Sequence, residues 1–528
     1  MSKQGKGVTL WITIAFAVIW AVLIGLDYGN KHPRYYFSFQ YFRFAGLFFS
    51  IFIIAGGTYL LKINNYLSSQ FLKPRGIHVV GLLLLIFSLV IFFNRNFGET
   101  ESSFSDLISF WSFAVFNLFV LTLFVIILRS MGQLIKHRLL RRLLLPSFTI
   151  ETAIGIVTFT TLLFFTAAFG WLSVTTVLLF LFLIAVANIT FLVNHIKGFL
   201  FTPISLDKTN LMGWASFVFI LFFLAVNFLS IHIPFPGGFD SRNVYVNISK
   251  LIAQNGSLVE GFQPYNWSLL MSVGFIMFDY VELALGLSFS AIVLSAIGVY
   301  EFSTKVLKID SNKTLFAIGL FIVTPALVNQ MFVEIKVDFG MLFIQLASLL
   351  VFFRWSSVVN DKTSGHYKLL ILLGLLCGFG MGVKLINMFL VFVLLALIWW
   401  EEEHKYGLIG VLLISVSILI FAGIDELSGL QVYHKSIRLT SLGCGVIGVG
   451  LLIFGFIRDS HSSIHKVTCS AIMGFSLLIM FSPWVGKNYM ESRSFSPKKL
   501  ILGKSPGPDV GNFFIINKKY KDSKKQKK

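Results

Sequence analysis

Long apolar runs separated by short polar segments make up most of the chain, and this pattern predicts membrane-spanning helices. A helix needs about 20 predominantly apolar residues to cross the hydrocarbon layer of a bilayer. About fifteen runs meet this requirement, with centres near residues 17, 53, 86, 117, 160, 183, 222, 291, 323, 347, 376, 393, 416, 448 and 476. The expected fold is therefore all-α, a polytopic membrane protein with about fifteen transmembrane helices.

The composition agrees with a membrane protein. Hydrophobic residues make up 56% of the 528 positions and charged residues 13%, whereas soluble domains average roughly 45–50% apolar and 25% charged. This balance excludes a soluble enzyme, a disordered protein and a secreted disulfide scaffold. Cys377, Cys444 and Cys469 lie in apolar runs, where we expect them to be small buried hydrophobes and neither disulfides nor metal ligands.

The positions of Lys and Arg predict which side of the membrane each loop faces, because short cytoplasmic loops carry an excess of both. The segment Arg129 to Arg142 is the densest basic loop, so we expect it in the cytoplasm together with the N-terminus. The net charge of +19 is then mainly a topology signal plus a lysine-rich tail, and it does not indicate nucleic acid. Counting spans from this loop predicts five further extracytoplasmic segments: Ile233 to about Trp267, Glu334 to Asp338, the turn at Lys384, the loop Asp425 to Arg438, and the residues after Pro483.

The longest of these segments contains a lone acid and a helical pattern. Prolines and glycines at positions 234–238 end the preceding helix and place Asp240 just beyond the membrane surface. Apolar residues at helical spacing then predict an amphipathic interfacial helix that Gly256 ends. Asp240 could equally be the N-cap of this helix, over Arg242 and Asn243.

A second acidic segment lies at a predicted span end on the same side. Glu334 and Asp338 flank Lys336 inside an apolar stretch, where charges are costly and usually face a cavity or a partner. An ordinary polar turn is the alternative. Lys384 follows a glycine-rich stretch that allows close helix packing, and its side chain could also extend to the membrane interface.

Four segments in the same order resemble the GT-C superfamily of membrane glycosyltransferases, in particular its protein O-mannosyltransferase and aminoarabinose transferase (glycosyltransferase family 39-like) group. They are the Asp240 loop with Pro264-Tyr265-Asn266-Trp267, then EIKVDFGMLFIQLASLLVFFRW, GLLCGFGMGVKLIN and SPWVGKNYMESRSFSP. The resemblance covers about Leu211 to Pro497. It implies three parts: residues 1–210 as an N-terminal membrane extension of about six helices with an accessory or packing role, residues 211–497 as the GT-C-like module, and residues 498–528 as a basic, disordered tail.

The resemblance implies transfer of a sugar from a polyprenyl-phosphate-linked donor to a protein, lipid or glycan acceptor on the extracytoplasmic face. Asp240 would be the general base of an inverting displacement, and lysines would meet the negative charge of the leaving lipid phosphate. The implied substrate-binding residues are Arg242, Tyr265, Trp267, Glu334, Lys336, Asp338, Lys384 and Lys487. Tyr265 and Trp267 could stack on a sugar or, as we favour, anchor the membrane interface.

Some features depart from the family pattern. Many relatives carry an acidic pair in the first loop, whereas Ser241 follows Asp240 here, so no metal site is predicted and a divalent metal remains open. The tail is expected outside the cell, contrary to the positive-inside tendency, so it either binds an anionic surface polymer or belongs to a truncated chain.

Two other functions share the substrate class. A transporter or flippase of lipid-linked sugars predicts ionisable residues deep in several spans, and the sequence has few. A polysaccharide polymerase usually has a large arginine-rich outer loop, which the sequence lacks.

Overall fold

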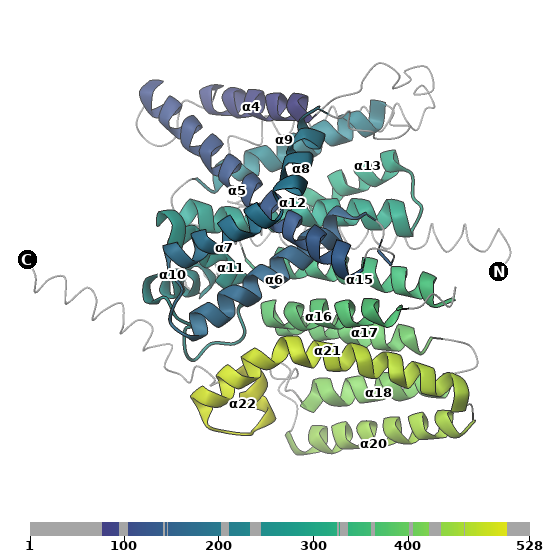
Figure 1. Ribbon diagram of the computed structural model, residues 1–528. Helices are drawn as coiled ribbons and strands as arrows, with labels where there is room; N and C mark the ends of the chain where they lie inside the picture. Colours follow the sequence, from purple (N-terminus) through teal and green to yellow (C-terminus); the bar gives the residue numbers. More distant parts are fainter. Residues whose placement is uncertain are drawn as a thin grey trace, which may run out of the picture.

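The computed structural model describes residues 76–93, 104–140, 143–144, 146–201, 211–232, 244–324, 327, 336–360, 365–400, 405–421, 434–458 and 460–503. Every regular element within these ranges is a helix, so the described part of the chain has the expected all-α fold. Most helices lie side by side and run across the view of Figure 1. The predicted span centres near residues 17 and 53 lie outside the described residues.

The prediction of about fifteen spans is wrong for the described residues. Seven helices are long and apolar enough to cross a membrane, or eight if the bent pair α7 and α8 is one span. Six other apolar helices have only 10–17 residues. At about 1.5 Å per residue they reach roughly 15–26 Å, short of the roughly 30 Å hydrocarbon layer. The number of spans was overestimated because a hydropathy pattern shows where apolar runs lie and does not show where a helix breaks. One such break is the extended backbone at Lys384 between α16 and α17.

The N-terminal extension contributes five described helices. They are α4 (Gly76–Phe93), α5 (Phe104–Leu139), α6 (Phe148–Ala168), α7 (Val174–Ala187) and α8 (Ile189–Phe201). Helices α5 and α6 cross so closely that a Cβ atom on Gly132 would lie 1.7 Å from the Glu151 carbonyl oxygen. Most of α6 is buried, and it packs against helices of the second half of the chain as well as against α5.

Residues 211–503 supply the remaining helices. They are α9 (Leu211–Ser230), α10 (Val246–Asn255), α11 (Asn266–Phe278), α12 (Val281–Glu301), η4 (Phe302–Val306), α13 (Ser311–Ile322), α15 (Asp338–Asn360), α16 (Tyr367–Val383), η5 (Leu385–Asn387), α17 (Met388–Ile398), α18 (Lys405–Phe421), α20 (His434–Arg458), α21 (Ser460–Ser492) and α22 (Pro497–Leu502). The core runs through both halves of the chain without interruption, because buried residues from α5 and α6 belong to the same cluster as those from α11, α12, α15 and α16.

The helix predicted in the first outer loop is present as α10. Its C-cap, Gly256, has a φ of 63°, a left-handed conformation that glycine adopts without strain. The apolar face, with Val246, Ile248 and Ile252, is buried, and α10 packs against α11.

The last helices form one edge of the bundle. Helices α18 and α20 pair tightly, since a Cβ atom on Gly410 would lie 2.7 Å from the Gly448 carbonyl oxygen. The other face of α20 exposes large apolar side chains, including Leu439 and Ile457, as expected for a surface in contact with lipid. Residues 498–502, predicted as part of the tail, belong to α22, and residues 504–528 lie outside the described part.

Candidate functional site

The predicted site residues fall into two groups. Asp240, Arg242 and Glu334 lie outside the described residues, so their roles stay predictions. The described ones come from the starts of α11 and α15 and the ends of α16 and α21; they are Tyr265, Trp267, Lys336, Asp338, Lys384 and Lys487. We call the place where these four helix ends meet the four-helix site.

Asn266 joins three of the four helices. Its buried side-chain amide donates from Nδ2 to the Phe379 carbonyl oxygen (3.0 Å) and accepts at Oδ1 from Trp484 Nε1 (2.9 Å). A Cβ atom on Gly382 would lie 2.1 Å from Asn266 Nδ2, so a larger residue at this point of α16 would displace the Asn266 side chain. The sequence analysis did not select Asn266, although it is the polar residue inside the Pro264–Trp267 segment.

Trp267 brings in the fourth helix. Its side chain is fully buried, and a Cβ atom on Gly340 would lie 2.3 Å from ring atom Cδ2, so the indole lies directly against the first turn of α15. The absence of a side chain at Gly340 is what makes room for the ring.

Tyr265 is also enclosed by protein. Its hydroxyl accepts from the Val259 N–H (2.7 Å) and donates to the Val259 carbonyl (3.0 Å), while its ring meets Trp484 edge-on at 4.6 Å. Burial raises the pKa of this phenol above its ordinary value. The rings of Tyr265 and Trp267 thus pack against protein, and both are buried in the described structure.

Asp338 and Lys384 form the accessible charged feature of the four-helix site. Lys384 Nζ lies 2.6 Å from Asp338 Oδ1, and the two side chains are 37% and 30% exposed. Asp338 begins α15, where the helix dipole favours a carboxylate. Lys384 follows α16 with φ −157° and ψ 127°, and this break in the helix directs the chain away from the α16 axis. Asp338, one of the two acids among the implied substrate-binding residues, thus holds Lys384.

Lys336 lies two residues before Asp338. Its carbonyl oxygen accepts a hydrogen bond from Ser288 Oγ of α12 (2.8 Å), which fixes the main chain at the entrance to α15.

Lys487 is buried in an ion pair. Its Nζ lies 2.6 Å from Glu491 Oε1, 5.6 Å from the centre of the Tyr265 ring and 5.9 Å from that of Trp484. The other oxygen of Glu491 accepts from the Gly261 N–H (3.1 Å). This pair therefore ties α21 to the loop between α10 and α11, and Lys487 is less accessible to a ligand than Lys384.

The N-terminal extension also contributes to the surroundings of the site. Leu172 N donates to the Gly256 carbonyl (3.1 Å) and Leu258 N to the Ala167 carbonyl (3.3 Å), so the α6–α7 turn holds the start of the loop that leads to Tyr265. Phe164 of α6 meets Trp484 edge-on at 4.8 Å. The described extension is thus part of the scaffold around the site.

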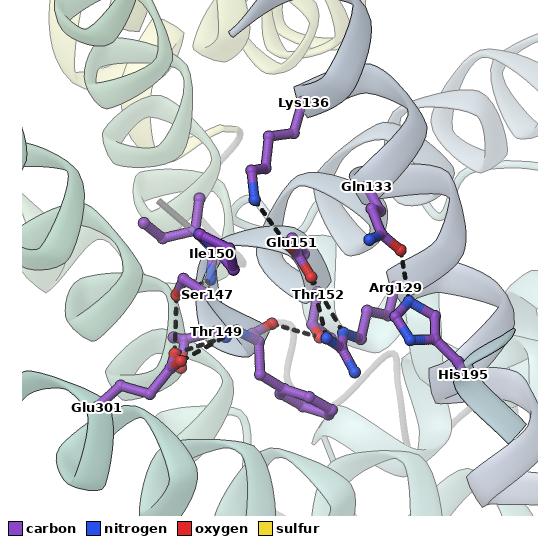
Figure 2. Close-up of polar contacts among 12 residues, drawn as sticks. Arg129, Gln133, Lys136, Ser147, Thr149, Ile150, Glu151, Thr152, His195 and Glu301 are labelled. Carbon is purple, nitrogen blue, oxygen red and sulfur yellow. Dashed lines mark hydrogen bonds and ion pairs between the residues drawn. The ribbon is translucent and has the colours of Figure 1, made fainter. Parts of the chain in front are cut away.

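Two buried acids, both missed by the sequence analysis, lie near the start of α6 (Figure 2). Glu151 receives Arg129 Nη2 at 3.1 Å and Lys136 Nζ at 2.7 Å. Glu301 of α12 accepts from Ser147 Oγ (2.8 Å) and from the first-turn N–H groups of Phe148 (3.1 Å) and Thr149 (2.9 Å), so it caps α6 from another helix. Glu151 could have been selected from the sequence, because it is a lone carboxylate in an apolar run.

Comparisons with protein-family models, curated proteins and solved structures found no match to this chain. The resemblance to GT-C glycosyltransferases therefore depends on the four sequence segments. Among the described residues, no group of three or more His, Cys, Asp or Glu side chains could hold a metal ion.

Proposed function

We propose that this chain is a membrane glycosyltransferase that moves a sugar from a polyprenyl-phosphate-linked donor to an acceptor on the extracytoplasmic face. The observation that carries the proposal is the meeting of four segments at one place. Residues near positions 266, 338, 384 and 484 are far apart in the sequence, yet Asn266, Trp267, Asp338, Lys384 and Trp484 join them through direct contacts.

The charge at the four-helix site suits a phosphate group. Lys384 is more than one-third exposed and held by Asp338, so its ammonium group is both oriented and accessible. A positioned cation stabilises the negative charge that develops on a leaving phosphate. Lys336, two residues before Asp338, would add a second positive charge.

The proposed reaction is a single displacement. The acceptor oxygen attacks the anomeric carbon as Asp240 takes the proton of the acceptor hydroxyl. The bond from the anomeric carbon to the phosphate oxygen breaks, and the lipid phosphate leaves with the electron pair beside Lys384. The anomeric configuration inverts because attack and departure occur on opposite faces.

A transfer assay in membranes tests the proposal. Membranes containing the full-length chain receive radiolabelled polyprenyl-phosphate mannose or polyprenyl-phosphate glucose, and label in lipid, glycan and protein fractions is counted. Removing a general base commonly costs about 10²- to 10⁴-fold in rate, so we expect a loss of this size for Asp240→Asn. Lys384→Gln should also lose transfer, and Lys384→Arg should retain more of it.

Lys368→Gln is the matched control, because Lys368 is an exposed lysine near the opposite end of α16. It should transfer as the wild type does. Unchanged transfer by Asp240→Asn at normal protein levels would overturn the proposed base, and unchanged transfer by Lys384→Gln would overturn the phosphate contact.

A carrier of lipid-linked sugars is the second candidate, and broken helices favour it. The helix break at Lys384 and the 78° bend between α7 and α8 are features common in transporters. In proteoliposomes, a carrier would move the labelled lipid between leaflets without forming a covalent sugar product.

A further inference from the structure

Two large aromatic side chains are exposed at the turn between α6 and α7. Phe169 and Trp171 are 65% and 68% exposed, and their rings stack with centres 5.3 Å apart. Gly170 between them has a φ of 71°, a left-handed conformation that glycine adopts without strain. We call residues 169–171 the aromatic turn. Exposed apolar surface on neighbouring residues marks a place where a partner or a lipid is in contact.

The aromatic turn begins where a candidate membrane span ends. Helix α6 has 21 residues and is one of the helices long and apolar enough to cross a membrane. At about 1.5 Å per residue it reaches roughly 31 Å, which matches the roughly 30 Å thickness of the hydrocarbon layer. An α6 that crosses the bilayer therefore places the aromatic turn at one boundary of this layer.

The surface that follows the aromatic turn is apolar. Helix α7 buries only Val177 and Ile184, so most of its side chains face away from the protein. The chain has no Asp, Glu, Lys or Arg between Glu151 and His195. A long uncharged surface of this kind is suited to contact with acyl chains. Its large exposed residues on α7 are Val174, Leu178, Leu179, Phe182, Leu183 and Val186.

The surface on the other side of the aromatic turn is polar. Leu172 N donates to the Gly256 carbonyl and Leu258 N to the Ala167 carbonyl, so the turn is fixed to the loop after α10. The exposed residues next to these contacts are Gln254, Asn255, Glu260 and Gln263. The aromatic turn thus lies on the border between an apolar and a polar surface. Tryptophan is enriched at such borders in membranes, because the indole has an apolar body and a polar N–H group.

We propose that the aromatic turn anchors the N-terminal extension in the interface between lipid and water, with the Trp171 indole at the level of the lipid headgroups. The exposed residues of α7 contact acyl chains on one side, and the loop after α10 meets water on the other. This anchor does not depend on the proposed sugar transfer or on which side of the membrane the turn faces.

The anchor also determines the depth of the loop that leads to α11. A Cβ atom on Gly256 would lie 2.7 Å from the Leu172 carbonyl oxygen, so the turn and the loop are packed closely. The same loop is tied to α21, because the Gly261 N–H donates to Glu491. A turn held at the headgroup level therefore holds this loop at the membrane surface.

Quenching of tryptophan fluorescence by brominated lipids tests the anchor. Full-length protein is reconstituted in phosphatidylcholine vesicles whose acyl chains carry bromine either close to the headgroup or close to the chain end. The emission of Trp171 is the difference between the wild type and Trp171→Phe. Trp171 is exposed and phenylalanine keeps a ring beside Phe169, so this variant should fold. We expect the Trp171 emission to show a larger loss with bromine close to the headgroup.

Trp355→Phe is the matched control, because Trp355 of α15 is only 6% exposed and its emission should lose little with either lipid. Quenching of Trp171 by aqueous iodide but by neither lipid would overturn the proposal, since the aromatic turn would then face water and suit a soluble partner such as a glycan. An equal or larger loss with bromine close to the chain end would also overturn it, because the turn would then lie within the hydrocarbon layer.

Discussion

Substitution of Gly382 by alanine tests whether the four-helix site is assembled as described. The added methyl group would lie 2.1 Å from Asn266 Nδ2, 2.8 Å from Asn266 Cγ and 3.0 Å from Trp484 Nε1. The two distances to Asn266 are shorter than real Cβ contacts, so the Asn266 side chain must move, and the contact with Trp484 is tight. Its movement breaks the hydrogen bonds to the Phe379 carbonyl and to Trp484.

The expected cost follows from two effects. Overpacking a filled interior costs about 1–3 kcal/mol. Leaving the buried Asn266 amide without partners costs about a further 1–3 kcal/mol. Alanine recovers up to about 1 kcal/mol through its higher helix propensity. We therefore expect Gly382→Ala to lower the free energy of unfolding by about 1–6 kcal/mol.

Unfolding of the purified protein in detergent, followed by tryptophan fluorescence, measures this loss. Gly486→Ala and Gly474→Ala on α21 are matched controls, because a Cβ atom at either position meets no atom within 4 Å. Both should be as stable as the wild type or slightly more stable. Adding Asn266→Ala to Gly382→Ala should cost less than the sum of the two single changes, since both remove the same contact. Gly382→Ala unfolding like Gly486→Ala would refute the described packing.

Two further predictions concern stability. His232, just beyond the α9 span, accepts at Nε2 from Asn117 Nδ2 (3.0 Å) and donates from Nδ1 to the Phe228 carbonyl (3.0 Å), and burial lowers its pKa to about 4. The folded-state pKa lies below the unfolded value of about 6.5, so the stability that neutral His232 contributes is present above pH 6.5 and is lost as pH falls toward 4, by about 3 kcal/mol at most. The melting temperature of His232→Leu should therefore depend less on pH between 4 and 6.5 than that of the wild type. An unchanged pH dependence would contradict the burial of a neutral imidazole. Glu301→Ala should lower the free energy of unfolding by about 2–4 kcal/mol, because two first-turn N–H groups of α6 lose their acceptor. The control Asp310→Ala removes an exposed cap of α13 and should cost about 1 kcal/mol. Equal melting temperatures for the two variants would show that Glu301 does not cap α6.

The sequence pattern was sufficient for local features. The apolar spacing in the first outer loop predicted a helix that Gly256 ends, and α10 ends at Gly256 as expected. Where a helix forms and ends depends mainly on residues close together in the sequence, so a local pattern can predict it. The segment around Asp338 and the turn at Lys384 were both selected as sparse charges in apolar runs, and the structure pairs them.

Local sequence patterns could not predict how many helices span the membrane or where the N-terminal helices pack. An apolar run can be a straight span or two short helices joined at a break, and hydropathy is the same for both. The contact of Phe164 with Trp484 joins residues 320 positions apart, and both are ordinary apolar residues in their own segments. Helices α6 and α21 both pack against α16, and this shared neighbour brings the two rings together.

Glycines and single polar side chains explain how such helices find one another in lipid. Helix surfaces of Leu and Phe gain little by leaving lipid for protein, because the two environments are equally apolar, so close approach and hydrogen bonds have to select the partner. Gly382 admits Asn266, Gly340 admits Trp267, and Gly132 lets α5 approach α6 at Glu151. Each of these glycines lies at a contact that contains a buried polar side chain or an indole, so shape and polarity specify the same pairing. A sequence with so few charged residues can therefore define one arrangement of helices, because the polar residues it keeps inside lie where a neighbouring helix comes close enough to bind them.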